Sequence, residues 1–492
     1  MKIRNFSNLR EFLFTNLTVK QTVFKNSLWL SLGLAINKLL MLALLIYVAR
    51  ILGAAEYGKF TFAFAFVSLL VIFHDFGLPA IITREFSKEG QEREDFYSIL
   101  SLKTLLGATA FFIIFLGSFI ITQDIETRKI ILILALFSII NGFAAVFYAV
   151  FQARQKMEYQ VWSEILQFLL ISGLGFFILF EFPSINNLSY AYFISSLFAF
   201  IFVLFLFHSK IFPLKINWKF SVWRKFLLLS WPLALTGLFG LIYGYIDSVM
   251  LGYWNMLEET GWYNAAYKIV MVSLIPMGLL STSLYPVLSK FFQESKEKLQ
   301  RAWGYQLNLM ILISFPLMAG GMVLAPGIIK LLYPAEFTPS ILAFQILIIS
   351  AGIISLSRPF YDIMIVFNRQ VKMFWITVAG AAVNVVLNLF LIPKYSLYGA
   401  ATATVITQFL ILILCFMFTY KFTTIRFFNL DILSVFMISL ISSALMYFAI
   451  KQPQIYNLNV LFAILIGVIT YAIAFFILRK TLNYFKYIYA SR

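Results

Sequence analysis

Four basic side chains lie inside long apolar segments of this sequence: Lys38, Lys103, Lys268 and Arg358. A lysine ammonium group meets a phosphate as a point charge, and an arginine guanidinium group can bind it through two parallel hydrogen bonds. An ionisable group surrounded by apolar sequence is costly, so its presence suggests a function. We therefore predict that these four residues bind an anionic ligand.

A structural interpretation stays open for these bases. Lys38, in GLAINKLLML, has no acidic residue three or four positions away, so it lines a cavity, snorkels, or pairs with another helix. Arg358 and Asp362 are four residues apart on one helical face and most simply neutralise each other. Near the mouth of its segment Arg358 could still receive a phosphate.

Acidic residues also occur near the ends of apolar segments. Asp75, with His74 beside it, is a candidate for binding a coupling ion, because burial raises the pKa of a carboxyl group. Lys103 could instead form a structural ion pair with Asp75 across a helical hairpin, and Lys268 could do the same with Asp247. His74 by itself is more simply structural or interfacial.

Four arginines lie at the ends of apolar segments or between them: Arg50, Arg84, Arg154 and Arg369. The first two are expected to anchor segments at the membrane interface. The other two belong to a phrase that occurs twice, FQARQKMEY (151–159) and VFNRQVKMFW (366–375). Positive charge in such loops fixes the orientation of a membrane protein, and it could also attract anionic lipid to an entrance.

The composition identifies the solvent for most of the chain as lipid. Of the 492 residues, 62% are hydrophobic and only 12% are charged, which exceeds what a soluble core can bury. In a membrane protein, Lys and Arg collect in cytoplasmic loops, so the net charge of +17 is interpreted as a signal of orientation. No nucleic acid partner is expected. One cysteine and two histidines exclude a disulfide framework and a Cys/His metal cluster, and no cofactor is expected.

Fourteen transmembrane helices fit the apolar pattern, because a span takes about 20 residues and the runs are continuous rather than alternating. The fold class is therefore an all-α polytopic membrane protein. The predicted spans lie near 27–49, 60–82, 97–121, 130–152, 161–180, 188–208, 226–249, 263–287, 304–325, 340–364, 373–392, 397–420, 431–450 and 458–478.

The distribution of positive charge predicts the orientation. With these spans, 27 of the 38 Lys and Arg residues lie on the side that holds both termini, and 7 lie on the other side. Cytoplasmic loops are enriched in Lys and Arg, so both termini are predicted to be cytoplasmic. Residues 1–26 have no compact apolar core before a cleavage site and are interpreted as a retained cytoplasmic arm.

The repeated phrase indicates two similar bundles. Each copy falls between the fourth and fifth helices of a six-helix group, and a Leu-Gly turn follows the first helix of each group. We predict an N-lobe (27–209), a cytoplasmic linker (210–225), a C-lobe (226–420) and two extra helices with a cytoplasmic tail (421–492). Parallel repeats of this kind favour alternating access around a central cavity.

Five motifs resemble the polysaccharide or oligosaccharide (Wzx-type) flippases of the multidrug/oligosaccharidyl-lipid/polysaccharide exporter superfamily. They are ARILGAAEYG, HDFGLPAIITREFS, FQARQKMEY, YIDSVMLGYW with GWYNAAYKI, and NLFLIPKYSLYGAATATVITQ. The resemblance implies a flippase that carries a polyprenyl-pyrophosphate-linked oligosaccharide across the cytoplasmic membrane. It also implies contacts with membrane lipids and other polysaccharide-assembly proteins.

The resemblance assigns roles to residues already singled out. Lys38 would line the cavity and meet the pyrophosphate, while Arg50 and Arg84, in motif turns, could gate. Asp247 becomes a second ion-coupling candidate, because antiporters of the superfamily use membrane acids, with H⁺ or Na⁺ as the coupling ion.

Two other functions remain as alternatives. A cation-coupled multidrug antiporter would favour an acidic cavity, and a membrane glycan ligase or polymerase would need a sizeable outer loop, which the predicted spans do not leave. The sequence contains no G-x-x-x-x-G-K-[ST] phosphate loop, so ATP hydrolysis in this chain is excluded as the driving force. The prediction is a transporter, not an enzyme.

Overall fold

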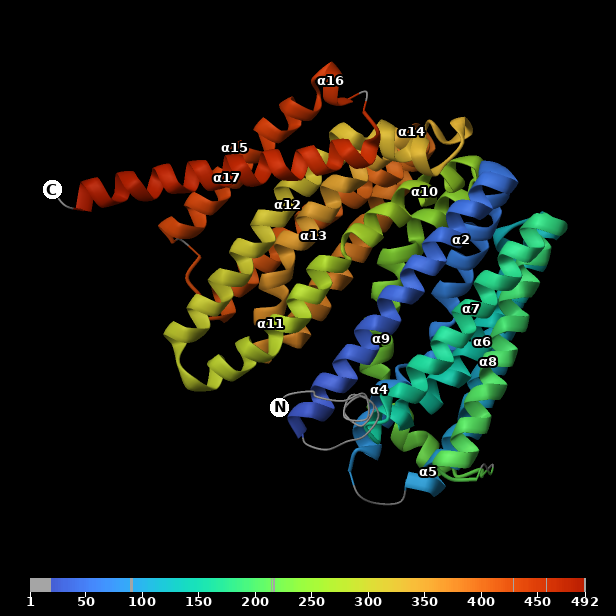
Figure 1. Ribbon diagram of the computed structural model, residues 1–492. Coiled ribbons are helices and arrows are strands. Elements are labelled where there is room, and N and C mark those ends of the chain that lie inside the picture. The colour runs from blue at the N-terminus through green and yellow to red at the C-terminus, as the bar shows by residue number, and fades with distance from the viewer. Residues whose placement is uncertain are drawn as a thin grey trace, which may run out of the picture. The chain divides into compact units, whose positions relative to one another are not determined.

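The computed structural model describes residues 19–88, 92–213, 215, 217–427, 429–456 and 458–490 (Figure 1). All regular secondary structure in these ranges is helical, which confirms the predicted class. The chain divides into two compact units, unit 1 (Met1–Leu257) and unit 2 (Glu258–Arg492). Each unit is described by itself below.

Unit 1 contains helices whose apolar faces pack around a cluster of phenylalanines that includes Phe96, Phe147 and Phe207. Its helices are α2 (Val19–Leu70), α3 (Ile72–Asp75), α4 (Leu78–Phe86), α5 (Glu92–Ile121), α6 (Ile125–Ala153), α7 (Met157–Glu181), α8 (Ile185–Lys210) and α9 (Phe220–Tyr253).

Unit 2 has its own core, in which Trp303 contacts Phe360 and Phe427. In Figure 1 α12 runs beside α13 and α15. The elements of unit 2 are α10 (Leu257–Ser273), α11 (Ile275–Glu294), α12 (Lys296–Leu332), the 3₁₀ turn η1 (Ala335–Phe337), α13 (Ser340–Val366), α14 (Gln370–Phe422), α15 (Leu430–Ile450), α16 (Pro453–Tyr456) and α17 (Val460–Ala490).

Twelve apolar segments in the described residues are long enough to cross a membrane, and two of them are long enough to cross it twice. The segment Leu39–Phe86 has 48 residues and α14 has 53. As straight helices they would measure about 70 and 80 Å, against a hydrocarbon core of about 30 Å. Each is broken at a residue with non-helical backbone angles, Gly53 (φ 78°) and Ser396 (φ 51°). Counting both halves gives the fourteen crossings that the sequence predicts.

The second crossing is also broken near its end, where the sequence predicts an uninterrupted helix over 60–82. Phe76 and Gly77 have left-handed angles (φ 49° and 70°) and separate α3 from α4. A Cβ atom at Gly77 would lie 2.9 Å from the Leu233 Cβ and 3.1 Å from the Ser230 carbonyl oxygen on α9. Glycine therefore allows both the turn and the close approach of α9.

The division between units lies one helix later than the linker predicted at 210–225. Helix α9, assigned from the sequence to the C-lobe, groups with unit 1 because it packs against α2, α4 and α5. The pairing of lobes remains a prediction.

The two copies of the repeated phrase form the same kind of turn. After α6, Gln155 has a left-handed conformation (φ 58°), and the Lys156 amide donates to the Phe151 carbonyl oxygen at 2.8 Å. After α13, Asn368 has φ 57°, and the Arg369 amide donates to the Met364 carbonyl oxygen at 2.9 Å. Both are helix C-caps of the Schellman type. The internal repeat thus extends to backbone hydrogen bonds.

Candidate functional site

Arg358 on α13 is an exposed base within a membrane-spanning helix. Its Nε lies 3.2 Å from Asp362 Oδ1, so the predicted i, i+4 pair is present. The two partners differ in exposure: the arginine side chain is 47% exposed and the aspartate side chain 3%. Arg358 lies eight residues before the end of α13, about 12 Å along the helix axis.

Three helices converge on the Asp362 carboxylate. Its Oδ2 accepts hydrogen bonds from Ser281 Oγ on α11 and from Gln306 Nε2 on α12, the latter at 2.8 Å. Arg358 Nε in turn donates to Ser281 Oγ at 3.0 Å. The buried acid is therefore well paired, as a buried charge must be. We call these four residues the arginine cluster: Ser281, Gln306, Arg358 and Asp362.

The arginine cluster leaves part of the guanidinium group available. The described contacts to Asp362 and Ser281 use Nε, so the two terminal amino groups remain as donors at the exposed end of the side chain. Such a planar donor pair matches two oxygens of a phosphate. The sequence predicted the Arg358–Asp362 pair but missed Ser281 and Gln306, which lie far away in the sequence and carry no motif.

Lys103 on α5 is placed differently from Arg358. Its side chain is fully buried, and its Nζ donates to the His74 carbonyl oxygen at 2.7 Å and lies 3.8 Å from Asp75 Oδ1. The ion pair expected as the structural alternative is therefore present. The lysine also satisfies a carbonyl group at the break between α3 and α4, which otherwise lacks a regular helical partner. We call Lys103, His74 and Asp75 the lysine latch.

The imidazole ring of His74 is enclosed within unit 1. It is 0% exposed, and neither ring nitrogen has a hydrogen-bond partner in the described residues. Gly142 on α6 and Gly107 on α5 line the ring, and a Cβ atom at Gly142 would collide with it. Phe143 lies at a ring distance of 5.1 Å. His74 is thus an interior residue of the helix packing.

The other residues proposed for ligand or ion binding are less fully placed. Lys38 belongs to α2, but its side chain lies outside what the structure describes. Asp247 on α9 is buried in unit 1, whereas Lys268 on α10 belongs to unit 2, so their pairing stays a prediction. Lys268 is half-buried, and the described residues of unit 2 offer it no hydrogen bond or ion pair.

Of the four arginines predicted as anchors or gates, Arg50 lies just before the break at Gly53 in α2, and the other three lie at helix ends. Arg50 is exposed, and Arg84 is paired through Nε with Glu85 at 3.0 Å. Both arginines of the repeated phrase lie over an aromatic ring: Arg154 is 5.5 Å from the ring of Phe212, and Arg369 is 5.8 Å from the ring of Phe422. Cation–π contacts of this kind stabilise the turns. Gating and lipid entry remain predictions.

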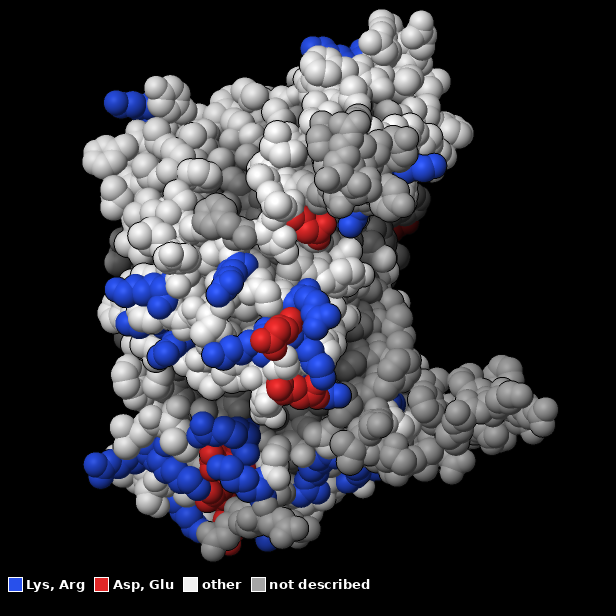
Figure 2. Space-filling view, turned by 90° about the vertical axis from the view of Figure 1, so that its left-hand side faces the viewer, with Lys and Arg blue, Asp and Glu red and all other residues white. Residues whose placement is uncertain are grey.

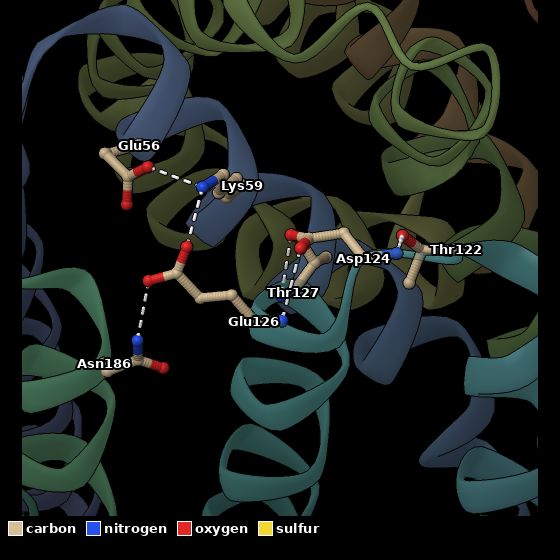
Figure 3. A network of polar contacts seen from close by, with 7 residues as sticks. All are labelled: Glu56, Lys59, Thr122, Asp124, Glu126, Thr127 and Asn186. Atoms are coloured by element: carbon tan, nitrogen blue, oxygen red, sulfur yellow. Dashed lines mark hydrogen bonds and ion pairs between the residues drawn. The ribbon is translucent and has the colours of Figure 1, made fainter.

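A polar network that the sequence did not reveal joins three helices of unit 1 (Figure 3). Lys59 on α2 pairs with Glu56 at 2.7 Å and with Glu126 on α6 at 2.9 Å. Glu126 also accepts a hydrogen bond from Asn186 on α8 at 2.8 Å. The E-x-x-K spacing of residues 56 and 59 was the available signal.

Asp124, in the same network, caps α6 (Figure 3). Burial acts to raise the pKa of its carboxyl group, but hydrogen bonds from Thr127 and from the Glu126 amide outweigh it and hold the pKa below its ordinary value. Figure 2 shows acidic side chains lying among basic ones on the visible face, which agrees with such pairing. The described residues contain no group of three His, Cys, Asp or Glu side chains that could hold a metal ion.

A family model described as "Polysaccharide biosynthesis protein" matches residues 23–292, more than half of the chain. The chain belongs to this family. The match begins in α2 and ends in α11, so it includes Ser281 but not the α12 and α13 residues of the arginine cluster.

Proteins similar to this chain come from archaea and bacteria. An uncharacterised membrane protein of Methanocaldococcus jannaschii is 26% identical over 80% of this chain and 84% of its own length. The probable low-salt glycan biosynthesis flippase Agl15 of Haloferax volcanii is 22% identical over 77% and 80%. The capsular polysaccharide biosynthesis protein CapF of Staphylococcus aureus is 22% identical over 81% and 99%.

Solved structures share the fold. The lipid II flippase MurJ in an inward closed conformation matches 92% of this chain and 99% of its own, with a TM-score of 0.78 and 16% identity. An inward-facing multidrug resistance MATE transporter of the MOP superfamily matches 80% and 97%, with a TM-score of 0.64 and 17% identity. The chain therefore has the same helical fold as these two proteins.

Proposed function

We propose that this protein is a flippase that moves a polyprenyl-pyrophosphate-linked oligosaccharide across the cytoplasmic membrane by alternating access, with both termini in the cytoplasm. The observation that carries the proposal is the arginine cluster. Asp362 and Ser281 fix Arg358 through Nε while its terminal amino groups stay exposed within a membrane span. A fixed, always charged donor pair in that place suits a pyrophosphate.

The names of two relatives support this proposal, and the charge of Arg358 argues against the antiporter alternative. Two curated relatives carry the names of a flippase and a capsular polysaccharide biosynthesis protein. A multidrug antiporter for organic cations is less well supported, since an exposed arginine would repel such a substrate. The driving force is an ion gradient, the membrane potential or the substrate gradient, because the chain has no phosphate-binding loop for ATP.

The test is a leaflet-transfer assay in liposomes. Purified protein is reconstituted with a fluorescent polyprenyl-pyrophosphate oligosaccharide, and the rate at which the label reaches the outer leaflet is measured with an impermeant quencher. We expect transfer by the wild type and loss by Arg358→Gln of about ten- to a hundredfold, because a hydrogen bond to a charged group contributes about 1.5–3 kcal/mol. Arg301→Gln is the matched control, since Arg301 is an exposed arginine of unit 2 outside the cluster.

Two results would separate the function from the site. Wild-type protein that leaves the labelled lipid in its original leaflet contradicts the flippase assignment. Transfer by the wild type that Arg358→Gln does not slow retains the function and removes the arginine cluster as the headgroup contact.

A further inference from the structure

A row of hydrogen-bonded side chains leads from the α6–α7 turn into the membrane span of α7. Gln152 Nε2 donates to Gln160 Oε1 at 2.9 Å, and Gln160 Nε2 donates to Glu164 Oε1 at 2.8 Å. The Thr83 hydroxyl on α4 lies 3.4 Å from Gln152 Oε1. We call Thr83, Gln152, Gln160 and Glu164 the amide row. The row ends on a carboxyl group.

Glu164 differs from three other acids within the helix bundles because none of the described residues places a base beside it. Glu158, Asp75 and Asp362 form ion pairs at 3.2, 3.8 and 3.2 Å. The described residues give the Glu164 carboxyl group one hydrogen bond, from the neutral Gln160 amide. A carboxylate has about four acceptor positions, so most of this capacity is unused and its charge is not neutralised.

The position of Glu164 on α7 turns it away from lipid. Trp162, Leu169 and Phe176 are exposed and follow each other at seven-residue spacing, which marks the lipid-facing side of the helix. Glu164 is two residues from Trp162, about 200° around the helix, and about 10 Å from the first residue of α7. Its half-buried carboxyl group therefore faces the inside of the bundle at membrane depth.

Within the part of the chain whose side chains are described, few titratable groups surround this carboxyl group. Helix α6 contributes Tyr148, which interacts electrostatically with Glu164. Helix α2 contributes Lys25, which pairs with Glu158 at 3.2 Å, six residues before Glu164 on α7. From the described residues of α8 no charged group interacts with it. One turn further into the span, Gln167 and Asn141 bond only to amide groups, at 2.6 Å.

We propose that Glu164 is a proton-binding site in unit 1. The ionised carboxylate takes up one proton and becomes a neutral carboxylic acid, and it returns the proton when it ionises again; no other bond changes. An unpaired carboxylate inside a membrane-spanning bundle is costly, and protonation removes that cost without a partner base. The amide row connects the site to the α6–α7 turn.

Infrared difference spectroscopy of the full chain in lipid nanodiscs over a pH series tests the proposal directly. We expect the wild type to show a protonated-carboxyl absorption that disappears in Glu164→Gln. Glu181→Gln, the same change at the exposed end of the same helix, should keep it. An absorption that Glu164→Gln leaves unchanged overturns the proposal.

A second variant covers failure of Glu164→Gln to fold. Glu164→Asp keeps a carboxyl group, so the absorption should move in frequency and in titration midpoint rather than vanish. An unmoved absorption in Glu164→Asp also overturns the proposal. These measurements need no transport activity, so they remain informative even if the flippase assignment fails.

A transport measurement extends the inference, and this part rests on the proposed function. In liposomes with an imposed pH gradient, wild-type lipid transfer should respond to the gradient and Glu164→Gln transfer should not. A response retained by Glu164→Gln would show that the proton bound at Glu164 does not drive transport. Asp75, paired with Lys103, would then be the next acid to test.

Discussion

The arginine cluster of unit 2 and the lysine latch of unit 1 start from the same ingredients, a base and an acid inside membrane-spanning helices. Arg358 is 47% exposed and its acid Asp362 is buried, whereas Lys103 is buried and its acid Asp75 is 39% exposed. The partner that is buried acts as the fixed support. The difference explains why Arg358 can meet a ligand and why Lys103 holds a broken helix together.

The largest expected effect comes from removing the support of the arginine cluster. Asp362→Leu leaves the buried Ser281 hydroxyl and the buried Gln306 amide without their acceptor, and each buried donor left unpaired costs about 1–3 kcal/mol. Denaturant titration of the reconstituted protein, followed by tryptophan fluorescence, should report this loss. The same measurement on Asp431→Leu, an exposed acid of unit 2, serves as the control.

The corresponding change in the lysine latch should be smaller. Lys103→Met removes the donor to the His74 carbonyl oxygen, and a hydrogen bond from a charged group contributes about 1.5–3 kcal/mol. Because Asp75 is partly exposed, no buried charge is left behind. The rate of lipid transfer should fall only in proportion to the amount of folded protein. A loss of transport at unchanged stability would instead assign Lys103 a ligand-binding role.

The packing around His74 offers a further test of the comparison between the buried lysine latch and the partly exposed arginine cluster. Gly142→Ala places a methyl group against the imidazole ring, and overpacking of a core costs about 1–3 kcal/mol. The double variant Gly142→Ala/His74→Ala should recover part of that loss, measured by thermal unfolding. Equal stability of the single and double variants would mean that the ring does not fill this space.

The smallest effects are expected at the two turns of the repeated phrase. Arg154→Leu and Arg369→Leu each remove a cation–π contact; Arg154 is half-buried and Arg369 exposed, and such a contact is worth about 0.5–1 kcal/mol at an exposed site. Both should lower the unfolding temperature slightly and by similar amounts. A much larger loss in one of them would show that its turn has a role that the other lacks.

Particular residues show how far sequence reasoning reached. The Arg358–Asp362 pair was predicted because i, i+4 neighbours on a helix meet whatever surrounds them. Ser281 and Gln306 were missed because they reach Asp362 from α11 and α12, and no local pattern encodes that convergence. The sequence alone does not single out Glu164, since the absence of a base around it among the described residues is a property of the packing.

The two copies of the repeated phrase show the same limit of sequence reasoning, here for the backbone conformation. By its letters, Arg154-Gln155 aligns with Arg369-Gln370. The left-handed residues are Gln155 and Asn368, so Lys156, rather than Arg154, is the backbone equivalent of Arg369. The similarity of the two copies was readable from the sequence, but the register between them was set by where each helix ends.

The sequence by itself determined the solvent of this protein, its helical class, the fourteen crossings and the repeat, because hydrophobicity and helical periodicity are local properties of the chain. The tertiary structure decided which of the membrane-embedded charges are presented and which are enclosed. Exposure and pairing depend on side chains that approach from other helices, as His74 and Asp75 do for Lys103 and Ser281 does for Arg358. Such contacts join residues far apart in the sequence, and no spacing rule within one helix can anticipate them.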